Sequence, residues 1–374
     1  MPYTLADLET PVPLVDLDRL AHNLDRMAAY ATLHQLALRP HVKTHKSTRV
    51  AVEQLRLGAA GLTCATPREL QVMREVTDDL YLAHAPLGPK LLRVLDATEG
   101  ATLRVAVDSL HAIETMGTTC RLRDRVVDVV IEVDVGMKRM GVAATNDVVR
   151  LAGAVQRQPG LRYRGIAFYP GHIRVPAVQQ DAQLEQLDDT VRDLIETLDR
   201  AGLHPHVVSG GSTPAAFRMH QVRGLTEVRP GTYVFNDRDT FALGASAWDD
   251  CALTVLATVV SDAVPGQVVI DAGSKALGRE PLRGADAAGF GAVIDHPEVR
   301  VVRMSEEHGI LDLSDSLWRP VVGEPVRIVP NHACIVTHGF DAMLGVRGDV
   351  VETWWTVGAR GRHLPDHAPA PLSP

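Results

Sequence analysis

The first two thirds of the chain alternate between short β-rich runs and amphipathic stretches, and this alternation limits the fold to a few parallel-sheet architectures. The β-rich runs cover residues 38–43, 61–64, 80–83, 103–107, 127–133, 164–168, 206–209 and 226–228. The clearest amphipathic stretch puts Leu184, Leu187, Val191 and Leu198 on one helical face and ends at Gly202. Eight β/α units in about 230 residues predict a TIM barrel, whereas the alternative, a doubly wound sheet, normally has fewer strands.

The pattern changes near residue 237, after which no long helical stretch separates the β-branched runs. These runs, at 253–260, 267–271, 326–329 and 350–357, are typical of a separate, largely antiparallel β domain. Residues 13–16 precede the first barrel helix and can supply a further strand to it. We therefore predict a barrel over residues 17–236, a β domain from residues 1–16 and 237–362, and a proline-rich, disordered tail over residues 363–374.

Composition narrows the functional class. The formal net charge of −8 argues against nucleic acid as the main partner, and no apolar run of about 18 residues is present to span a membrane. The N-terminus lacks the basic and apolar regions of a secretory signal. The four cysteines are too few for a disulfide framework, so Cys64, Cys120 and Cys251 are predicted to be buried thiols. These features predict a cytoplasmic protein.

Residues 39–47, Arg-Pro-His-Val-Lys-Thr-His-Lys-Ser, place two lysines and two histidines at the end of an early β-rich run. A lysine at the mouth of a strand is where an enzyme keeps an amine that must react while neutral, with its pKa lowered by burial or nearby positive charge. The main use of such an amine is a Schiff base with a carbonyl, most often that of pyridoxal phosphate. A plain surface cluster of lysine and histidine is the alternative.

A glycine-rich turn follows a late β-rich run. It comprises Ser209, Gly210, Gly211, Ser212 and Thr213, and a second glycine turn follows at Gly231, Thr232 and Tyr233. Glycines let the backbone approach an anion, and a helix start offers free N–H groups. Late loops of a TIM barrel are the usual phosphate site, so we predict phosphate binding at these two turns, with a plain βα turn as the alternative.

His332 and Cys334 form a His-x-Cys pair after an apolar run of the β domain. On an extended segment this spacing puts both side chains on one face, and these two ligand types suit zinc. Two protein ligands leave room for water or substrate, which is typical of a catalytic metal; a buried thiol beside an incidental histidine is the alternative. His308 is a candidate further ligand or an ordinary loop histidine.

Four segments together resemble the fold type III pyridoxal phosphate enzymes, in the branch of D-threonine aldolase and eukaryotic-type D-serine dehydratase. The segments are residues 10–16, 39–46, 209–213 and 229–237, and the match covers nearly the whole chain in the same order. The resemblance implies a barrel of the alanine racemase type, a C-terminal β domain, and a homodimer with active sites near the subunit interface.

The resemblance also implies residue roles. Lys43 matches the Schiff-base lysine, and Arg139 matches an arginine beside the cofactor ring. Tyr169 and His172 stand where the family has active-site aromatic and histidine groups. Dehydratases of this branch pair His-x-Cys with zinc, whereas D-threonine aldolases show His-x-Asp with a harder metal such as manganese. Cys334 therefore favours a dehydratase with zinc, although manganese or magnesium stays open.

The substrate implied is a D-β-hydroxy-α-amino acid such as D-serine or D-threonine. In a dehydratase Lys43 takes the Cα proton, the metal coordinates the β-hydroxyl, and the products are a keto acid and ammonia. In the aldolase alternative a base removes the hydroxyl proton, and His172 is the candidate for this base, acting directly or through water. The products are then glycine and an aldehyde. An amino acid racemase, which needs no metal, and a non-catalytic cofactor carrier, which lacks the C-terminal domain, are the remaining alternatives.

Overall fold

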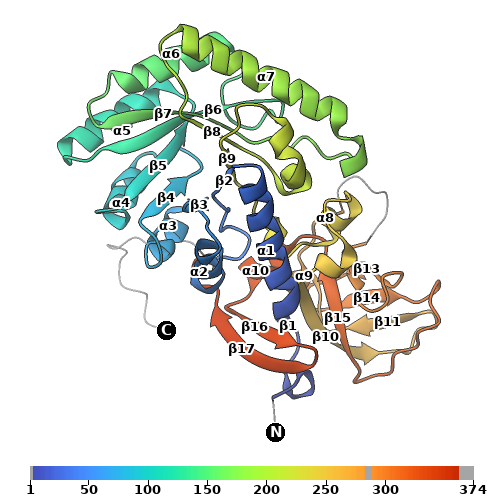
Figure 1. Cartoon of the computed structure of the whole chain (residues 1–374). Helices are drawn as coiled ribbons and strands as arrows, with labels where there is room; N and C mark the ends of the chain where they lie inside the picture. The colour runs from blue at the N-terminus through green and yellow to red at the C-terminus, as the bar shows by residue number, and fades with distance from the viewer. Residues whose placement is uncertain (1–2, 283–288, 362–374) are drawn as a thin grey trace, which may run out of the picture.

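The computed structural model describes residues 3–282 and 289–361, and the predicted tail over residues 363–374 lies outside them. Two sheets organise the chain: a parallel sheet of eight strands and a nine-stranded sheet that is mostly antiparallel. In Figure 1 the parallel sheet and its helices fill the upper part, and the second sheet lies below and to the right. None of the helices among the described residues has the length and apolar character needed to span a membrane.

The parallel sheet has the strand order β2-β9-β8-β7-β6-β5-β4-β3. Its strands are β2 (Ala37–Leu38), β3 (Leu62–Cys64), β4 (Asp79–Leu82), β5 (Thr102–Val107), β6 (Val127–Val133), β7 (Leu161–Phe168), β8 (Val207–Gly210) and β9 (Glu227–Val228). The two ends of the sheet meet, because the N–H of Val42 donates to Thr63 O and the N–H of Thr63 donates to Pro40 O. The eight strands therefore curl into a barrel, as the alternating pattern predicts.

Helices cover the outside of the barrel between successive strands. They are α1 (Leu17–Leu33), α2 (Thr48–Arg56), α3 (Pro67–Met73), α4 (Pro89–Ala97), α5 (Leu110–Leu122), α6 (Thr145–Gln156) and α7 (Asp181–Arg200). Residues 184–198 lie in α7, and the leucines and Val191 of their predicted apolar face are buried. After β8, the 3-10 helix η3 (Thr213–Gln221) replaces a full α-helix, so the loop that follows β8 stays close to the barrel mouth.

The predicted first barrel strand, residues 38–43, is wrong in extent. Only Ala37 and Leu38 form β2, and residues 42–45 form a turn in which the N–H of Lys46 donates to Val42 O. Pro40 has no N–H to give to a ladder, which ends regular pairing early. Lys43 consequently lies in a tight turn rather than at the end of a strand.

The second sheet combines strands from both ends of the chain, in the order β11-β14-β13-β12-β15-β10-β1-β16-β17. Its strands are β1 (Val12–Asp16), β10 (Leu253–Ser261), β11 (Gln267–Ile270), β12 (Gly291–Val293), β13 (Arg300–Met304), β14 (Gly309–Asp312), β15 (Pro325–Pro330), β16 (Ala342–Arg347) and β17 (Val350–Thr356). An additional β10–β11 pairing closes six of these strands on themselves. The β1–β16 pair is parallel, and β1 leads directly into α1 of the barrel.

Three short helices lie among the strands that follow the barrel: α8 (Arg238–Ala242), α9 (Ser274–Leu277) and α10 (Ala333–Gly339). Figure 1 shows α8 and α10 between the barrel and the strands of the second sheet. Hydrogen bonds join the two parts there, since the Thr337 hydroxyl donates to Thr44 O and the N–H of Ala359 donates to Lys46 O. The second sheet thus brings α10 against the turn that holds Lys43.

Candidate active site

A pocket opens at the carboxyl ends of the barrel strands, under α8 and the start of α10. Its lining includes His41, Lys43, Ala83, Glu132, Arg139, Tyr169, Arg174, Gly211, Ser212, Thr213, Pro214, Arg229, Gly231, Thr232, Asp237, Asp239, Thr240 and His332. Loops at this end of a TIM barrel are where such folds carry their chemistry. The structure therefore brings together most of the site residues predicted from the sequence, from segments almost 300 positions apart.

Lys43 points its amine toward the Tyr169 ring, with 5.8 Å between Nζ and the ring centroid. The guanidinium of Arg139 lies over the same ring, with Cζ 4.8 Å from the centroid. His41 is neutral beneath them, because burial first, and then the charge of Lys43, lower its pKa well below the usual value. Its Nδ1 accepts the backbone N–H of Lys43 at 3.4 Å, so a residue of the pocket lining holds the turn that carries Lys43.

His172 does not line the pocket with Lys43. It packs against Gly136, because a Cβ on Gly136 would come within 3.1 Å of His172 Nε2. Burial lowers the pKa of His172, partly offset by Asp134, so the imidazole is neutral near pH 7. Its Nδ1 is buried without a hydrogen-bond partner among the described residues.

The two glycine turns form one side of the pocket. Gly211 has φ +110°, a conformation that L side chains rarely adopt, and a Cβ on Gly231 would lie 2.9 Å from Thr44 Oγ1. The Thr213 hydroxyl accepts the N–H of Thr232 at 3.1 Å and so joins the two turns. Within the described part of the chain, the Ser212 hydroxyl is buried with no hydrogen-bond partner. The two turns therefore form a small polar hollow in which the Ser212 hydroxyl is available as a hydrogen-bond donor.

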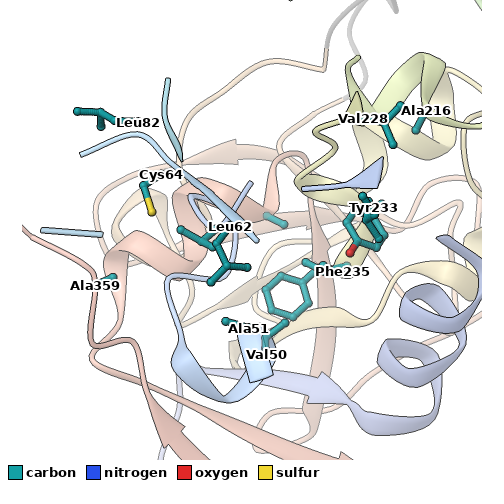
Figure 2. Packing of buried hydrophobic residues seen from close by; sticks show 14 of the residues in the cluster. Val50, Ala51, Leu62, Cys64, Leu82, Ala216, Val228, Tyr233, Phe235 and Ala359 are labelled. Atoms are coloured by element: carbon teal, nitrogen blue, oxygen red, sulfur yellow. The ribbon is translucent and has the colours of Figure 1, made fainter. Parts of the chain in front are cut away.

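Three residues predicted for this cradle, Ser209, Gly210 and Tyr233, do not line the pocket. The Ser209 hydroxyl donates to Glu227 inside the barrel, and a Cβ on Gly210 would meet the Phe168 ring. The Tyr233 hydroxyl accepts a hydrogen bond from Gln54 Nε2 at 2.9 Å, and Figure 2 shows the Tyr233 ring beside Phe235 in the hydrophobic cluster.

The prediction that His332 and Cys334 lie on an extended segment is wrong. Strand β15 ends at Pro330, His332 is the N-cap of α10, and Cys334 is the second residue of that helix. The helix starts there because the Asp237 carboxylate accepts the N–H of Ala333 at 3.0 Å. His308, the other candidate ligand, lies in the exposed turn between β13 and β14 and does not line the pocket.

The helical turn still leaves the two side chains adjacent. Burial alone would lower the pKa of His332, but the Cys334 thiolate and the Asp237 carboxylate raise it to about 11. Burial alone would raise the pKa of Cys334, but His332 and Lys43 together hold it below its ordinary value. Asp237 Oδ2 lies 3.1 Å from His332 Nδ1, so Nε2 is the nitrogen left to bind a ligand. Among the described residues, no group of three or more His, Cys, Asp or Glu side chains is arranged around one metal position.

Five further charged residues that line the pocket were not predicted from the sequence: Glu132, Arg174, Arg229, Asp237 and Asp239. Arg229 and Asp237 are the first and last residues of the 229–237 segment, in which only the glycine turn was predicted to bind phosphate. Arg229 Nη2 donates to Phe168 O at 3.1 Å, while its Nε has no partner among the described residues. Burial raises the pKa of Glu132, partly offset by Arg229 and Arg139. Glu132 and Arg174 carried no signal beyond their positions close to the ends of β-rich runs.

Two family models match the chain. "Alanine racemase, N-terminal domain" matches residues 15–239, and "Putative serine dehydratase domain" matches residues 252–346. Two curated proteins are similar over almost their whole length. A D-threonine aldolase of Arthrobacter sp. is 31% identical over 96% of this chain and 94% of that enzyme. A D-threo-3-hydroxyaspartate dehydratase of Delftia sp. is 35% identical over 95% of this chain and 98% of that enzyme.

Solved structures agree with these sequence matches. A D-threonine aldolase from Filomicrobium marinum superposes with a TM-score of 0.88 at 31% identity, over 96% of this chain and 97% of that one. A D-threo-3-hydroxyaspartate dehydratase variant superposes with a TM-score of 0.86 at 32% identity, over 95% of this chain and 99% of that one. That variant has alanine in place of a cysteine and is in a metal-free form, and a second variant has alanine in place of a histidine two positions earlier.

Proposed function

Because this chain belongs to the D-amino acid lyases of the fold type III pyridoxal phosphate family, we propose that it is a metal-dependent lyase of D-β-hydroxy-α-amino acids. We propose dehydration, with a keto acid and ammonia as products, as its reaction. The observation that supports this proposal is that His332 lines the same pocket as Lys43 and lies against Cys334, whose pKa is lowered by His332 and by Lys43.

The residues present fit pyridoxal phosphate. Lys43 is the amine that would hold the cofactor aldehyde, and the hydrogen bond from its backbone N–H to His41 Nδ1 holds its turn in place. The Ser212 hydroxyl, unused in the structure, and the backbone at Gly211 and Gly231 suit a phosphate, since a side chain at either glycine would strain or fill the hollow. When bound, the cofactor supplies an acceptor for the electrons released at Cα.

The donors also fit one divalent metal with an open coordination sphere. A thiol whose pKa is lowered by its neighbours and an imidazole whose Nδ1 lies 3.1 Å from a carboxylate form the ligand chemistry of zinc. We therefore propose zinc rather than manganese or magnesium, which prefer oxygen ligands. Such an ion supplies a Lewis acid for the β-hydroxyl oxygen of the substrate.

The chain's own residues then divide the work. Lys43 Nζ removes the proton from Cα, and the surrounding turn holds it against the Tyr169 ring. Arg139, stacked on the Tyr169 ring, is the guanidinium that would lie beside the cofactor ring. His332 and Cys334 would hold the metal, which would supply a Lewis acid for the β-hydroxyl oxygen.

Retro-aldol cleavage is the second candidate, because a D-threonine aldolase is 31% identical over nearly the whole chain. It needs a base for the hydroxyl proton, and His172 is kept neutral by burial. His172 faces Gly136 rather than the pocket lining, however, which favours dehydration.

Product analysis tests the proposal. Purified holoenzyme is incubated with D-serine, D-threonine and their L-forms, with and without chelator. Keto acid plus ammonia from the D-forms alone, lost on chelation, is the expected result, whereas glycine plus an aldehyde would identify the aldolase. Interconversion of D- and L-forms that survives chelation would replace the lyase by a racemase.

We further propose a cytoplasmic homodimer. The four cysteines are free thiols, and three of them, Cys64, Cys120 and Cys251, are buried, which suits a reducing compartment. Sedimentation or light scattering of the holoenzyme measures the assembly directly, and a monomer that remains fully active would contradict it.

A further inference from the structure

Glu132 is a buried carboxylate of the pocket that no step above uses. It is the last but one residue of β6, only 4% of its surface is exposed, and it lines the pocket together with Lys43. Its Oε2 is buried and has no hydrogen-bond partner among the described residues. Burying an ionised carboxylate is costly unless other charges compensate for the lost water, so the neighbours of Glu132 indicate what it does there.

Glu132 lies on the wall of the barrel opposite Lys43. In the closed order β2-β9-β8-β7-β6-β5-β4-β3, strand β6 is four places from β2 in either direction. Lys43 follows β2, and Glu132 stands near the carboxyl end of β6. A molecule held between the two walls therefore has Lys43 on one side and Glu132 on the other.

Two arginines of the pocket act on this carboxylate. Burial raises the pKa of Glu132, and Arg229 first, then Arg139, oppose that rise because their positive charges favour the ionised form. Asp108, which follows β5, is the third charged group near Glu132 and acts in the opposite direction. Its carboxylate accepts the N–H of Gly141 at 3.0 Å. The surroundings of Glu132 thus carry more positive than negative charge.

Both arginines are held by groups other than Glu132 on one side. The guanidinium of Arg229 lies over the Tyr81 ring, with Cζ 4.9 Å from the centroid, and its Nη2 donates to Phe168 O at 3.1 Å. Its Nε is buried and has no partner among the described residues. Arg139 stacks on the Tyr169 ring. Rings and carbonyls orient these guanidiniums, but they do not neutralise them.

The other carboxylates that line the pocket in the described part of the chain are engaged elsewhere. Asp237 holds His332 Nδ1, and Asp239 contacts Arg174 Nη1 at 3.6 Å. Glu132 is therefore the pocket carboxylate that is left to balance the two arginines on its own side.

We propose that Glu132 is a positioning residue: its carboxylate is the shared counter-charge of Arg139 and Arg229, holds both guanidiniums beside the cofactor, and limits the positive charge around Lys43 Nζ. The inference rests on the proposed function, since it requires pyridoxal phosphate at Lys43, but it holds for either lyase reaction. Two arginines and one carboxylate carry one net positive charge, and loss of the carboxylate would leave two.

The test follows the absorbance of the bound cofactor with pH, in zinc-saturated holoenzyme without substrate. Lys43 Nζ, once joined to the cofactor aldehyde, can carry one proton, and the absorbance reports that proton. Glu132→Gln keeps the size of the side chain and removes its charge. Protonation of Lys43 Nζ then becomes harder, so the midpoint pH of the absorbance change should fall by about one pH unit, as expected for a unit charge acting across a protein pocket.

Asp128→Asn is the matched control, because Asp128 is also a buried carboxylate on β6 and also forms ion pairs with two arginines, Arg162 and Arg164. It lies four residues before Glu132, about 13 Å nearer the amino end of the strand. The control should lower the free energy of unfolding without moving the midpoint pH.

A second substitution tests the charge balance itself. Arg139→Gln removes one of the two positive charges, so the midpoint pH should rise, and the double variant with Glu132→Gln should return it close to the parent value. If Glu132→Gln alone does not fold, the double variant restores the balance and should fold. A double variant that also fails to fold would overturn the assignment, because unbalanced charge would not be the cause.

Two further outcomes would overturn it. One is an unchanged midpoint pH in a folded Glu132→Gln variant. The other is an equal shift in Asp128→Asn, which would mean that any loss of a buried carboxylate from β6 loosens the barrel. A parent protein without cofactor absorbance would refute the proposed function and this inference together, whereas a wrong choice of reaction leaves the measurement unaffected, because no substrate is present.

Discussion

Lys43 and Lys46 are three residues apart in one turn, but their surroundings assign them different tasks. Lys43 lies in the pocket near the Tyr169 ring. Lys46 is buried and forms an ion pair with Glu69, whose other oxygen accepts the N–H of Ala65 at 2.6 Å. A buried pair of this kind stabilises the local fold only while both partners are present.

Lys43→Ala should therefore remove covalent cofactor attachment while leaving the fold intact. The measurement is the visible absorbance of the bound cofactor, together with the mass of the borohydride-reduced protein. Lys46→Ala should keep the attachment but lower the free energy of unfolding by about 3–5 kcal/mol, because Glu69 is left buried and unpaired. Attachment that persists in the Lys43 variant and disappears in a folded Lys46 variant would reverse the assignment.

His45, in the same turn, links stability to pH. Burial lowers its pKa from 6.5 to about 3, and its Nδ1 accepts the N–H of Ser47. Since the unfolded chain binds a proton that the folded chain does not, His45 stabilises the fold above about pH 6.5, and this contribution is lost as pH falls toward 3.

Between pH 7 and pH 5 the loss attributable to His45 is about 2 kcal/mol. Urea unfolding of the parent and of His45→Gln at both pH values measures it. The variant is expected to be less stable at pH 7 but to lose less stability on acidification. Identical losses in the two proteins would show that His45 is not the group that titrates.

At the scale of elements, the site depends on how strands end. β8 and β9 both end in glycine turns, and the short 3-10 helix η3 keeps the loop between them near the pocket. β2 ends after two residues, and the chain then turns so that Lys43 faces the same hollow. Regular strands continued into these segments would have carried their side chains past the pocket.

Gly211→Ala should weaken cofactor binding through the shape of this turn. Gly202→Ala is a matched control, because both glycines have positive φ, +110° and +72°, and the space around Gly202 is open. Each substitution should cost about 1 kcal/mol in the free energy of unfolding, from backbone strain. Only the Gly211 variant should raise the concentration of cofactor needed for half-saturation, measured by equilibrium dialysis. Equal cofactor affinity in both variants would argue against a phosphate at Gly211.

At the scale of the whole molecule, Asp237 links the barrel to the second sheet. Its carboxylate caps α8 through the N–H of Thr240, accepts the N–H at the start of α10, and holds His332 Nδ1. It is fully buried where the chain passes from one part to the other. The orientation of His332 therefore depends on how the two parts are docked.

Asp237→Asn keeps the size of the side chain but removes the charge that orients His332. We expect metal affinity to fall about 10- to 100-fold, as for other outer carboxylates of metal-binding histidines. Zinc content after dialysis against buffered metal measures this, and cofactor absorbance should be unchanged. Full metal affinity with lost stability would mean that Asp237 only caps the two helices.

Local patterns in the sequence are sufficient for much of this architecture. The two-residue period of strands and the 3.6-residue period of helices predict the eight β/α units and the change to a β domain after residue 237. They do so because side-chain burial repeats with the geometry of each element. The glycine turns and the lysine segment were visible because they break those periods. Such signals depend only on neighbours along the chain.

What only the tertiary structure decided is which distant residues share a pocket. It placed Asp237 on His332, brought Arg174 and His332 into the lining of one pocket, and turned Tyr233 and Ser209 into the core. It also converted the expected extended His-x-Cys segment into a helix start, since the capping carboxylate comes from 95 positions earlier in the chain. Such contacts form when two domains dock, and no local period encodes them, because their energy comes from charges and hydrogen bonds between segments far apart in sequence.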